Sequence, residues 1–233
     1  MPNGLLDSDG ADDSWRPVII AHGGGNSSER VLSYREIRAD YLEVDLWVHH
    51  GQFEARHERR VRYTPILFEK WYLRRIGGRY GLVEMLEAAA ETDAGVFLDI
   101  KNGGARAAEL LRAAIDGVEG APPRIVASSQ QWRALRAMGE LCPEVDAFYS
   151  IDVTAKLDLF RAVIERDARP RGISCRHGLL TPAVVQELHD RGLLVVAWTV
   201  DDLERARELV SWGVDGLTTH KVAEFAAEFV TQP

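Results

Sequence analysis

Short apolar segments recur along this 233-residue chain, and a helical pattern follows each of them. They predict eight buried strands, at residues 17–21, 41–47, 95–101, 124–128, 145–149, 172–175, 193–198 and 214–217. Strand–helix alternation favours a parallel sheet. Eight such units in one α/β domain of this length predict a closed (β/α)8 TIM barrel with parallel strands, with an open doubly wound sheet as the alternative. The open sheet ranks lower because the Gly23–Gly25 run is too short for a dinucleotide-binding fingerprint.

Other segments set the domain boundaries and the connections. Residues 1–16 are rich in Asp, Gly and Ser, so we expect a flexible lead-in without a secretory signal, followed by a single barrel domain at residues 17–233. A first helix is expected from Ser28 to about residue 39. His50-Gly51 predicts a tight turn and residues 52–55 a returning hairpin arm. Residues 58–79 form the longest connection, which we expect to be an irregular lid or substrate loop.

Charge and composition narrow the range of partners. The net charge of −8 and the pI of about 5.4 argue against a nucleic-acid-binding surface, which needs a basic patch. A small anionic substrate is still compatible, because a bound metal and local arginines can reverse the field inside a cleft. No apolar run approaches the ~20 residues of a membrane helix. The two cysteines, Cys142 and Cys175, form no CxxC pair, which disfavours a thiolate metal site and fits a reducing, cytoplasmic location. The oligomeric state is not indicated.

Two carboxylates interrupt the apolar strand at residues 41–47. Glu43 and Asp45 stand at positions i and i+2, so both side chains point to the same face of the strand. Two like charges on one apolar face repel each other and resist desolvation. A divalent cation would compensate them, and so would arginine partners or an exposed sheet edge; this stretch alone does not decide between these explanations.

Further polar residues fall at the carboxyl ends of other strands, where barrels of this kind build their sites. Asp99 and Lys101 repeat the i, i+2 spacing, while His22 ends the first strand and His57 follows the hairpin arm. Three carboxylates then supply only oxygen, which suits Mg2+ or Ca2+. Two histidines could transfer protons near neutral pH, and Lys101 adds a fixed positive charge. The set indicates chemistry on a phosphoryl group, and the histidines at 177 and 220, in loops at the same mouth, are given less weight.

The order of these motifs resembles the glycerophosphodiester phosphodiesterase family, whose members are TIM barrels of the phospholipase C-like type. The similarity covers roughly residues 18–221. The motifs that carry it are Ala21-His22-Gly23-Gly24, Glu43-Val44-Asp45, His57-Glu58, Asp99-Ile100-Lys101, Trp198-Thr199-Val200 and the Gly-Val-Asp-Gly at 213–216.

The resemblance implies metal-dependent hydrolysis of glycerophosphodiesters to glycerol 3-phosphate and an alcohol, through a cyclic phosphate. It implies that His22 and His57 are the acid and the base. It also implies that Lys101 neutralises the phosphoryl oxygens and that Trp198 forms the wall of the glycerol pocket. The ligands of one divalent cation, Mg2+ or Ca2+, would be Glu43, Asp45 and Asp99.

Three departures from the family pattern leave other functions open. Gly23 stands where the family has an arginine, the usual Pro-Glu-Asn-Thr segment is absent, and Asp99 replaces a glutamate. The arginines around His57 either replace the lost one or form a solvated face, and we prefer the latter; they are Arg56, Arg59, Arg60 and Arg62. The alternatives are a related phospholipase D- or C-like phosphodiesterase or lyase acting on lysophospholipid, and a barrel that binds a phosphodiester without turnover.

Overall fold

The computed structural model describes residues 15–61, 64, 66–69, 72–75, 80–164 and 170–230. The predicted lead-in at residues 1–16 therefore lies almost entirely outside the described residues. Of that segment, Trp15 and Arg16 are described, and both terminal guanidinium nitrogens of Arg16 donate to the carboxylate of Asp40, at 2.8 and 2.9 Å. Arg16 thus belongs to the folded part of the chain.

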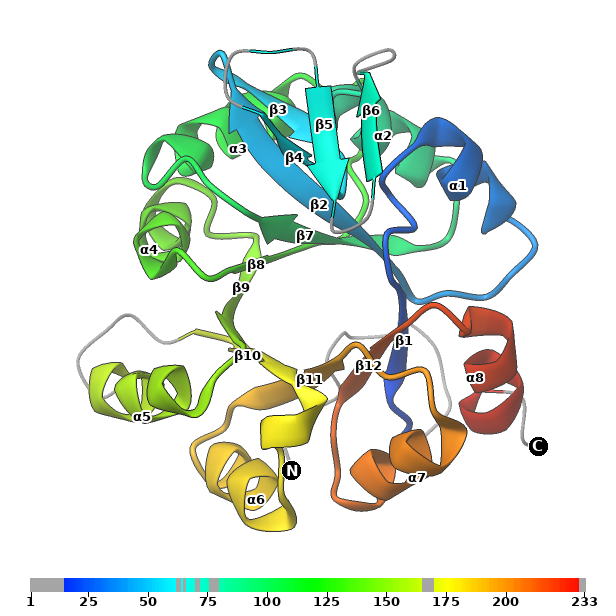
Figure 1. Cartoon of the computed structure of the whole chain (residues 1–233), viewed down its shortest axis with the longest axis vertical. Helices are drawn as coiled ribbons and strands as arrows, with labels where there is room; N and C mark the ends of the chain where they lie inside the picture. The colour runs from blue at the N-terminus through cyan, green and yellow to red at the C-terminus, as the bar shows by residue number, and fades with distance from the viewer. Residues whose placement is uncertain are drawn as a thin grey trace.

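The described strands form the predicted closed barrel (Figure 1). Within the described residues eight parallel strands follow one another around the sheet, and β1 pairs with both β12 and β2, which closes the ring. The barrel strands are β1 (Val18–Ala21), β2 (Tyr41–His49), β7 (Gly95–Ile100), β8 (Ile125–Ser129), β9 (Asp146–Ile151), β10 (Gly172–Arg176), β11 (Leu194–Trp198) and β12 (Gly216–Thr219). The fold predicted from the alternating pattern is confirmed.

Helices surround the barrel, as Figure 1 shows. They are α1 (Ser28–Ser33), α2 (Leu82–Ala90), α3 (Arg106–Asp116), α4 (Trp132–Leu141), α5 (Thr154–Val163), α6 (Pro182–Asp190), α7 (Leu203–Ser211) and α8 (Val222–Phe229), with the short 3-10 helix η1 (His177–Leu179) after β10. The prediction of a first helix reaching residue 39 is wrong, because α1 ends at Ser33. The chain must then return to the start of the barrel, where the Asp40 carboxylate accepts the Ile19 N–H at 2.7 Å.

The interior of the barrel has an apolar lower layer, and it is polar at the mouth, where the carboxyl ends of the strands lie. One buried cluster is built from strand residues alone and fills the interior; it contains Ile20, Tyr41, Phe97, Val126, Phe148, Leu194 and Val196. Side chains at the outward-facing positions of the strands, such as Leu98 and Ile100, pack instead against the helices. Glu43 and Asp45 stand two and four residues after Tyr41, so their side chains also point into the barrel. Both carboxylates therefore lie in the mouth, above this apolar layer.

A hairpin and a small sheet follow β2. His50 and Gly51 have φ angles of 48° and 74°, as a tight two-residue turn requires, and β3 (Gln52–Ala55) returns antiparallel to β2 as predicted. The expectation that residues 58–79 are irregular is wrong for the described residues. β4 (Arg59–Arg60), β5 (Ile66–Glu69) and β6 (Tyr72–Arg75) form an antiparallel sheet, drawn above β2 in Figure 1. These strands are too short to show a clear periodicity, and their local pairing holds them together.

Candidate active site

Three carboxylates meet inside the mouth of the barrel. Asp45 of β2 and Asp99 of β7 are direct partners in the parallel register, and Glu43 lies one inward position deeper. One oxygen from each of Glu43, Asp45 and Asp99 lies within 4.8 Å of the others. Glu43 and Asp45 are almost fully buried, at 4% and 1% exposure. The structure therefore brings together the three residues predicted as metal ligands.

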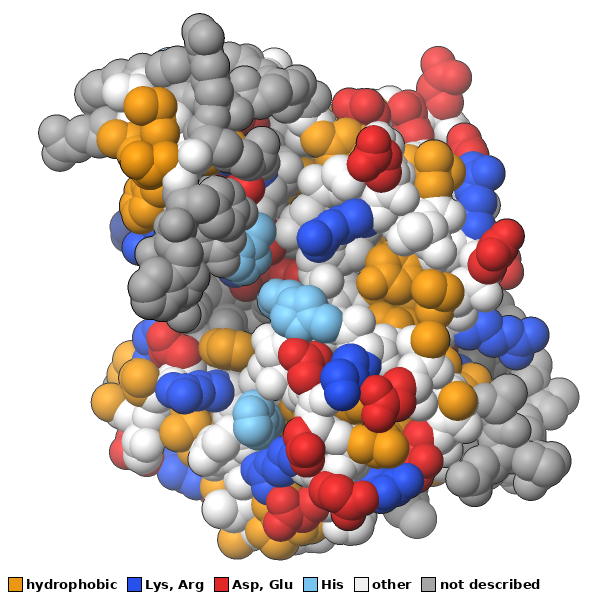
Figure 2. Space-filling view, turned by 45° about the vertical axis from the view of Figure 1, so that its right-hand side comes forward, with side chains coloured by type: hydrophobic (Ala, Val, Ile, Leu, Met, Phe, Trp, Pro, Cys, Tyr) orange, Lys and Arg blue, Asp and Glu red, His pale blue; other side chains and the backbone are white. Residues whose placement is uncertain are grey.

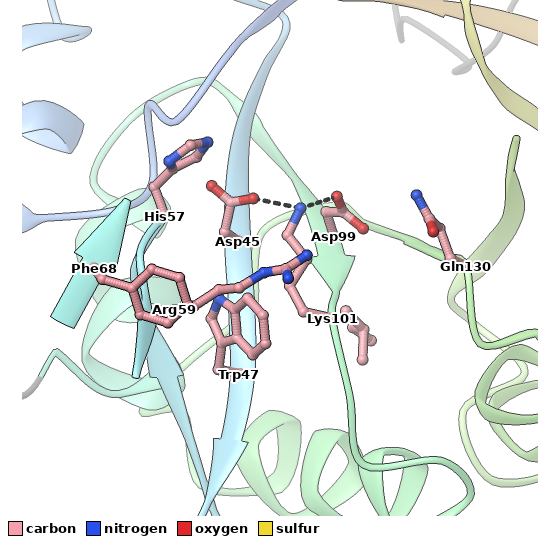
Figure 3. Close-up of a pocket in the computed structure, with 9 residues that line it drawn as sticks. Asp45, Trp47, His57, Arg59, Phe68, Asp99, Lys101 and Gln130 are labelled. Carbon is pink, nitrogen blue, oxygen red and sulfur yellow. Dashed lines mark hydrogen bonds and ion pairs between the residues drawn. The ribbon is translucent and has the colours of Figure 1, made fainter. Parts of the chain in front are cut away.

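Lys101 stands between two of these carboxylates. Its Nζ lies 2.6 Å from Asp45 Oδ1 and is also paired with Asp99 Oδ2 (Figure 3). One ammonium leaves two of the three negative charges without a cationic partner inside the cluster. Oxygen donors with that residual charge fit a hard divalent cation.

The loop after β1 fixes the orientation of the acidic side chains. The backbone N–H of Gly23 donates to Glu43 Oε2 at 2.6 Å. Asn26 bonds Asp45 twice, since its Nδ2 donates to Asp45 Oδ2 and its Oδ1 accepts the Asp45 backbone N–H, both at 2.9 Å. Asn26 was missed as a site residue in the sequence, and only its position a few residues after His22 hinted at it. These two hydrogen bonds hold the Asp45 carboxylate in place.

Burial and mutual repulsion shift the carboxyl pKa values. Burial, together with the charges of Asp45 and Asp99, raises the pKa of Glu43 well above its usual value. Burial also raises the pKa of Asp99, although Lys101 opposes this. Burial acts in the same direction on Asp45, but the Lys101 ammonium and the hydrogen bonds from Lys101 and Asn26 outweigh it and lower the pKa. Burial alone would lower the pKa of Lys101, yet the three carboxylates raise it, so Lys101 is charged.

The two predicted catalytic histidines lie beside this cluster, and His57 lines the same pocket as Asp45 and Asp99. His22 follows β1, and its Nδ1 is 3.4 Å from Glu43 Oε2. The ring centroids of His22 and His57 are 6.0 Å apart, with the planes at 77°. Burial, more than the neighbouring charges, lowers the pKa of His22 to about 4. Figure 2 shows histidine side chains beside a hollow with acidic side chains deeper in it.

A pocket of about 660 Å³ opens beside the carboxylates. In Figure 3 Trp47, Arg59 and Phe68 lie toward one end and Gln130 toward the other, with Lys101 between them. Its lining residues are Asp45, Trp47, His57, Arg59, Phe68, Asp99, Ile100, Lys101 and Gln130. Trp198, the predicted glycerol wall, ends β11 on the far side of the barrel and is half-buried outside this lining.

The arginines around His57 do not share one role. Arg56 is buried; its Nε donates to Glu54 Oε2 at 3.1 Å and its guanidinium lies 5.1 Å from the Trp47 ring centroid. Arg60 also donates to Glu54, at 3.2 Å. The preference for a solvated face is therefore wrong for Arg56 and Arg60, which form a structural network, and Arg59 lines the pocket. Arg62 lies outside the described residues.

A different arginine lies beside Gly23. Arg30 of α1 donates from Nη1 to the Gly23 carbonyl oxygen at 3.1 Å. A Cβ added at Gly23 would meet this Nη1 at 2.8 Å and Asn26 Nδ2 at 3.2 Å. The Arg30 guanidinium thus lies directly beside Gly23, the residue that follows His22. It was also missed in the sequence, because it stands seven residues away and reaches the site only through the turn into α1.

Comparisons with known proteins place the chain in a family. The model of the glycerophosphoryl diester phosphodiesterase family matches residues 95–224, more than half of the chain. The chain belongs to this family. Membership makes it an enzyme of the phosphoric diester hydrolase class, as the motifs predicted. A comparison with curated proteins finds no significant match.

Solved structures share the fold over nearly the whole chain. An Oleispira antarctica phosphodiesterase in complex with the product sn-glycerol-3-phosphate has 16% identity and a TM-score of 0.75, covering 91% of this chain and 96% of that one. The glycerophosphodiester phosphodiesterase of Thermotoga maritima has 19% identity and a TM-score of 0.70, with coverage of 92% and 99%. That of Parabacteroides distasonis has 18% identity and a TM-score of 0.70, with coverage of 92% and 97%. At these identities the likeness concerns the fold.

No helix within the described residues combines the length and apolar character needed to cross a membrane.

Proposed function

We propose that this glycerophosphoryl diester phosphodiesterase family member hydrolyses glycerophosphodiesters to glycerol 3-phosphate and an alcohol, with a divalent cation. The observation that carries the proposal is the cluster of three carboxylate oxygens within 4.8 Å of one another, beneath two imidazoles 6.0 Å apart. The Oleispira antarctica relative, whose structure contains sn-glycerol-3-phosphate, supports this substrate class.

The proposed cation ligands are Glu43, Asp45 and Asp99. Their donors are all oxygen and carry excess negative charge beside a single ammonium, which fits Mg2+ or Ca2+. When bound, such a cation supplies positive charge to a phosphoryl oxygen. Lys101 adds a second positive charge at the same place, where it would neutralise the other phosphoryl oxygens.

His22 and His57 are the proposed proton-transfer pair. Burial lowers the pKa of His22 to about 4, so its imidazole is neutral at pH 7 and has an unprotonated ring nitrogen that can accept the proton of an attacking hydroxyl. That hydroxyl is carried by the glycerol carbon adjacent to the one that bears the phosphodiester. Its oxygen forms a bond to phosphorus while the bond between phosphorus and the oxygen of the alcohol breaks. His57 then protonates the leaving alkoxide. Water opens the resulting cyclic phosphate, with the two roles reversed.

Trp198 is proposed to contact the glycerol moiety. It ends β11, the strand next to β12, and so lies on the side of the mouth away from β7. The 660 Å³ pocket on the β2 and β7 side, with Arg59 and Phe68 in its wall, is then available to the alcohol. A cytoplasmic location also stays a prediction, which the two buried free cysteines support.

A second candidate function is action on lysophospholipids. Phe68 lines the pocket and is 37% exposed, and the neighbouring Leu73 is 70% exposed. Apolar side chains at the rim would suit an acyl chain leaving the pocket. Cyclic phosphate released from lysophosphatidylcholine, with no turnover of glycerophosphocholine, would select this candidate.

The deciding experiment measures release of glycerol 3-phosphate from glycerophosphocholine. We expect turnover with added Mg2+ or Ca2+, none after EDTA, and loss in a His22→Ala variant. A His50→Asn variant is the matched control, because His50 is an exposed turn residue with a positive φ that asparagine tolerates. Full activity in EDTA, or in His22→Ala, would contradict the proposed mechanism.

A further inference from the structure

A third histidine lies against His22. His220 is the first residue after β12, and its ring centroid is 4.5 Å from that of His22, with the planes at 77°. His22 therefore contacts His220 more closely than it approaches His57, which is 6.0 Å away. The three rings come from three segments of the chain, after β1, β3 and β12, and converge on one mouth.

Asp201 fixes the orientation of His220. One carboxylate oxygen of Asp201 lies 2.8 Å from His220 Nδ1, and the other accepts the His220 backbone N–H at 2.8 Å. The hydroxyl of Thr219 donates to Asp201 Oδ1 at 3.0 Å. Although burial alone would raise it, these hydrogen bonds lower the pKa of Asp201. Asp201 occupies the Nδ1 side of the ring, so Nε2 is the ring nitrogen left for another hydrogen-bond partner.

Packing does not explain this arrangement. The His220 side chain is 57% exposed, so the ring is held by hydrogen bonds and not by burial. A second Asp–His pair in the chain gives the contrast. His189 bonds Asp215 through Nε2 at 2.9 Å, and the buried Asp215 also accepts the Val195 N–H at 2.8 Å. That pair joins α6 to the start of β11 and lies away from the mouth.

We propose that His220 contacts substrate and accepts a hydrogen bond from a hydroxyl of the glycerol moiety, with Asp201 as its positioning residue. The inference rests on the proposed function, because it assigns the polyol end of the same substrate. An imidazole Nε2 whose Nδ1 is bonded to a carboxylate can accept a hydrogen bond from a hydroxyl, whereas phosphoryl oxygens are acceptors and are matched by Lys101. β12 lies between β1 and β11, so His220 stands between His22 and the strand that ends at Trp198. It thereby adds a polar contact to the side of the mouth proposed for glycerol.

Calorimetry with two ligands separates hydroxyl recognition from phosphate recognition. We would titrate sn-glycerol 3-phosphate and inorganic phosphate into the magnesium-loaded full chain, comparing wild type with His220→Ala, His220→Gln and Asp201→Asn. His220→Ala is expected to weaken glycerol 3-phosphate binding about tenfold, the equivalent of one hydrogen bond, and to leave phosphate binding unchanged. His220→Gln, which offers an amide oxygen near the Nε2 position, should recover part of the loss. Asp201→Asn should lose less than His220→Ala.

The matched control is His189→Gln, which removes the other Asp–His pair. It is expected to lower the melting temperature without changing the affinity for either ligand. Equal losses for glycerol 3-phosphate and phosphate in His220→Ala, or no loss for either, would overturn the inference. So would a wild type that binds the two ligands equally well. A wild type that discriminates between them through His220 yet never hydrolyses glycerophosphocholine would refute the proposed function and leave the hydroxyl contact standing.

Discussion

Asp45 and Asp99 face each other across adjacent strands, with the Lys101 ammonium between them. Neither carboxylate can move away, because each belongs to the register of a parallel pair whose outward side chains are packed against helices. The negative charge of the mouth is thus set by strand alignment. Charge that the backbone holds in place must be met by protons or by cations.

Stabilisation by a divalent cation should increase with pH. A carboxyl whose pKa is raised by folding stabilises the fold below its unfolded pKa, and this stability is lost as the pH rises through the folded pKa. Glu43 and Asp99 are of this kind, so the cation-free protein loses stability toward neutral pH. A cation binds the ionised form, so Mg2+ or Ca2+ should raise the melting temperature more at pH 8 than at pH 5. Equal shifts at both pH values would contradict a carboxylate site.

Glu43→Gln should separate stability from metal binding. The substitution removes a buried charge that repels Asp45 and Asp99 while keeping the shape of the side chain. We expect the cation-free variant to melt a few degrees higher than wild type at pH 8, since about 1 kcal/mol corresponds to roughly 2–4 °C in a chain of this size. The shift on adding cation should disappear. Glu36→Gln, at an exposed position, is the control, and it should change neither quantity.

Loss of the His22 imidazole should mainly reduce kcat. General acid–base catalysis contributes roughly 10²–10⁴-fold, so His22→Asn is expected to lower kcat for glycerophosphocholine by that factor. The affinity for inorganic phosphate, measured by calorimetry, should change little, because the cation ligands and Lys101 remain. A variant that lost phosphate affinity and kept kcat would show that His22 binds the substrate and does not transfer its proton.

Arg30→Ala should weaken substrate binding. The guanidinium lies against the Gly23 carbonyl, next to His22, where a positive charge would attract a phosphodiester. A charged hydrogen bond is worth about 1.5–3 kcal/mol, so we expect KM to rise roughly 10- to 100-fold with a smaller change in kcat. Arg35→Ala is the control, because Arg35 forms an exposed pair with Glu91. If both variants behave alike, Arg30 does not contact the substrate.

Glu54→Ala should destabilise the protein and displace His57. The substitution leaves the buried Arg56 without its carboxylate partner, which typically costs about 3–5 kcal/mol, or roughly 10 °C in melting temperature. Arg56 immediately precedes His57, and its backbone N–H donates to the Asp45 carbonyl oxygen at 2.9 Å. Because a shift of Arg56 would move His57 with it, kcat should also fall. Glu109→Ala removes an exposed pair with Arg106 and should leave both values near wild type.

The sequence predicted those features that follow from periodicity. Alternation within residues 41–47 placed Glu43 and Asp45 on one face, and the same rule paired Asp99 with Lys101. The positive φ angles at His50 and Gly51 agree with the predicted turn. Asn26 and Arg30 escaped prediction, and His220 was placed at the mouth but given little weight, because loop contacts bring these residues to the site and no repeat in the sequence encodes such contacts. The small sheet after His57 was missed because its strands have two to four residues.

The β2–β3 hairpin carries a further consequence. Two proposed cation ligands and one proposed catalytic imidazole lie on a single run of chain, residues 43–57, that folds back at His50 and Gly51. The turn therefore fixes the distance between the proposed cation site and the proposed proton donor. Inserting one residue in the turn would shift the register of β3 and turn its side chains to the opposite face. The length of this turn should therefore vary little among relatives, whereas the small sheet that follows it can vary in length and sequence.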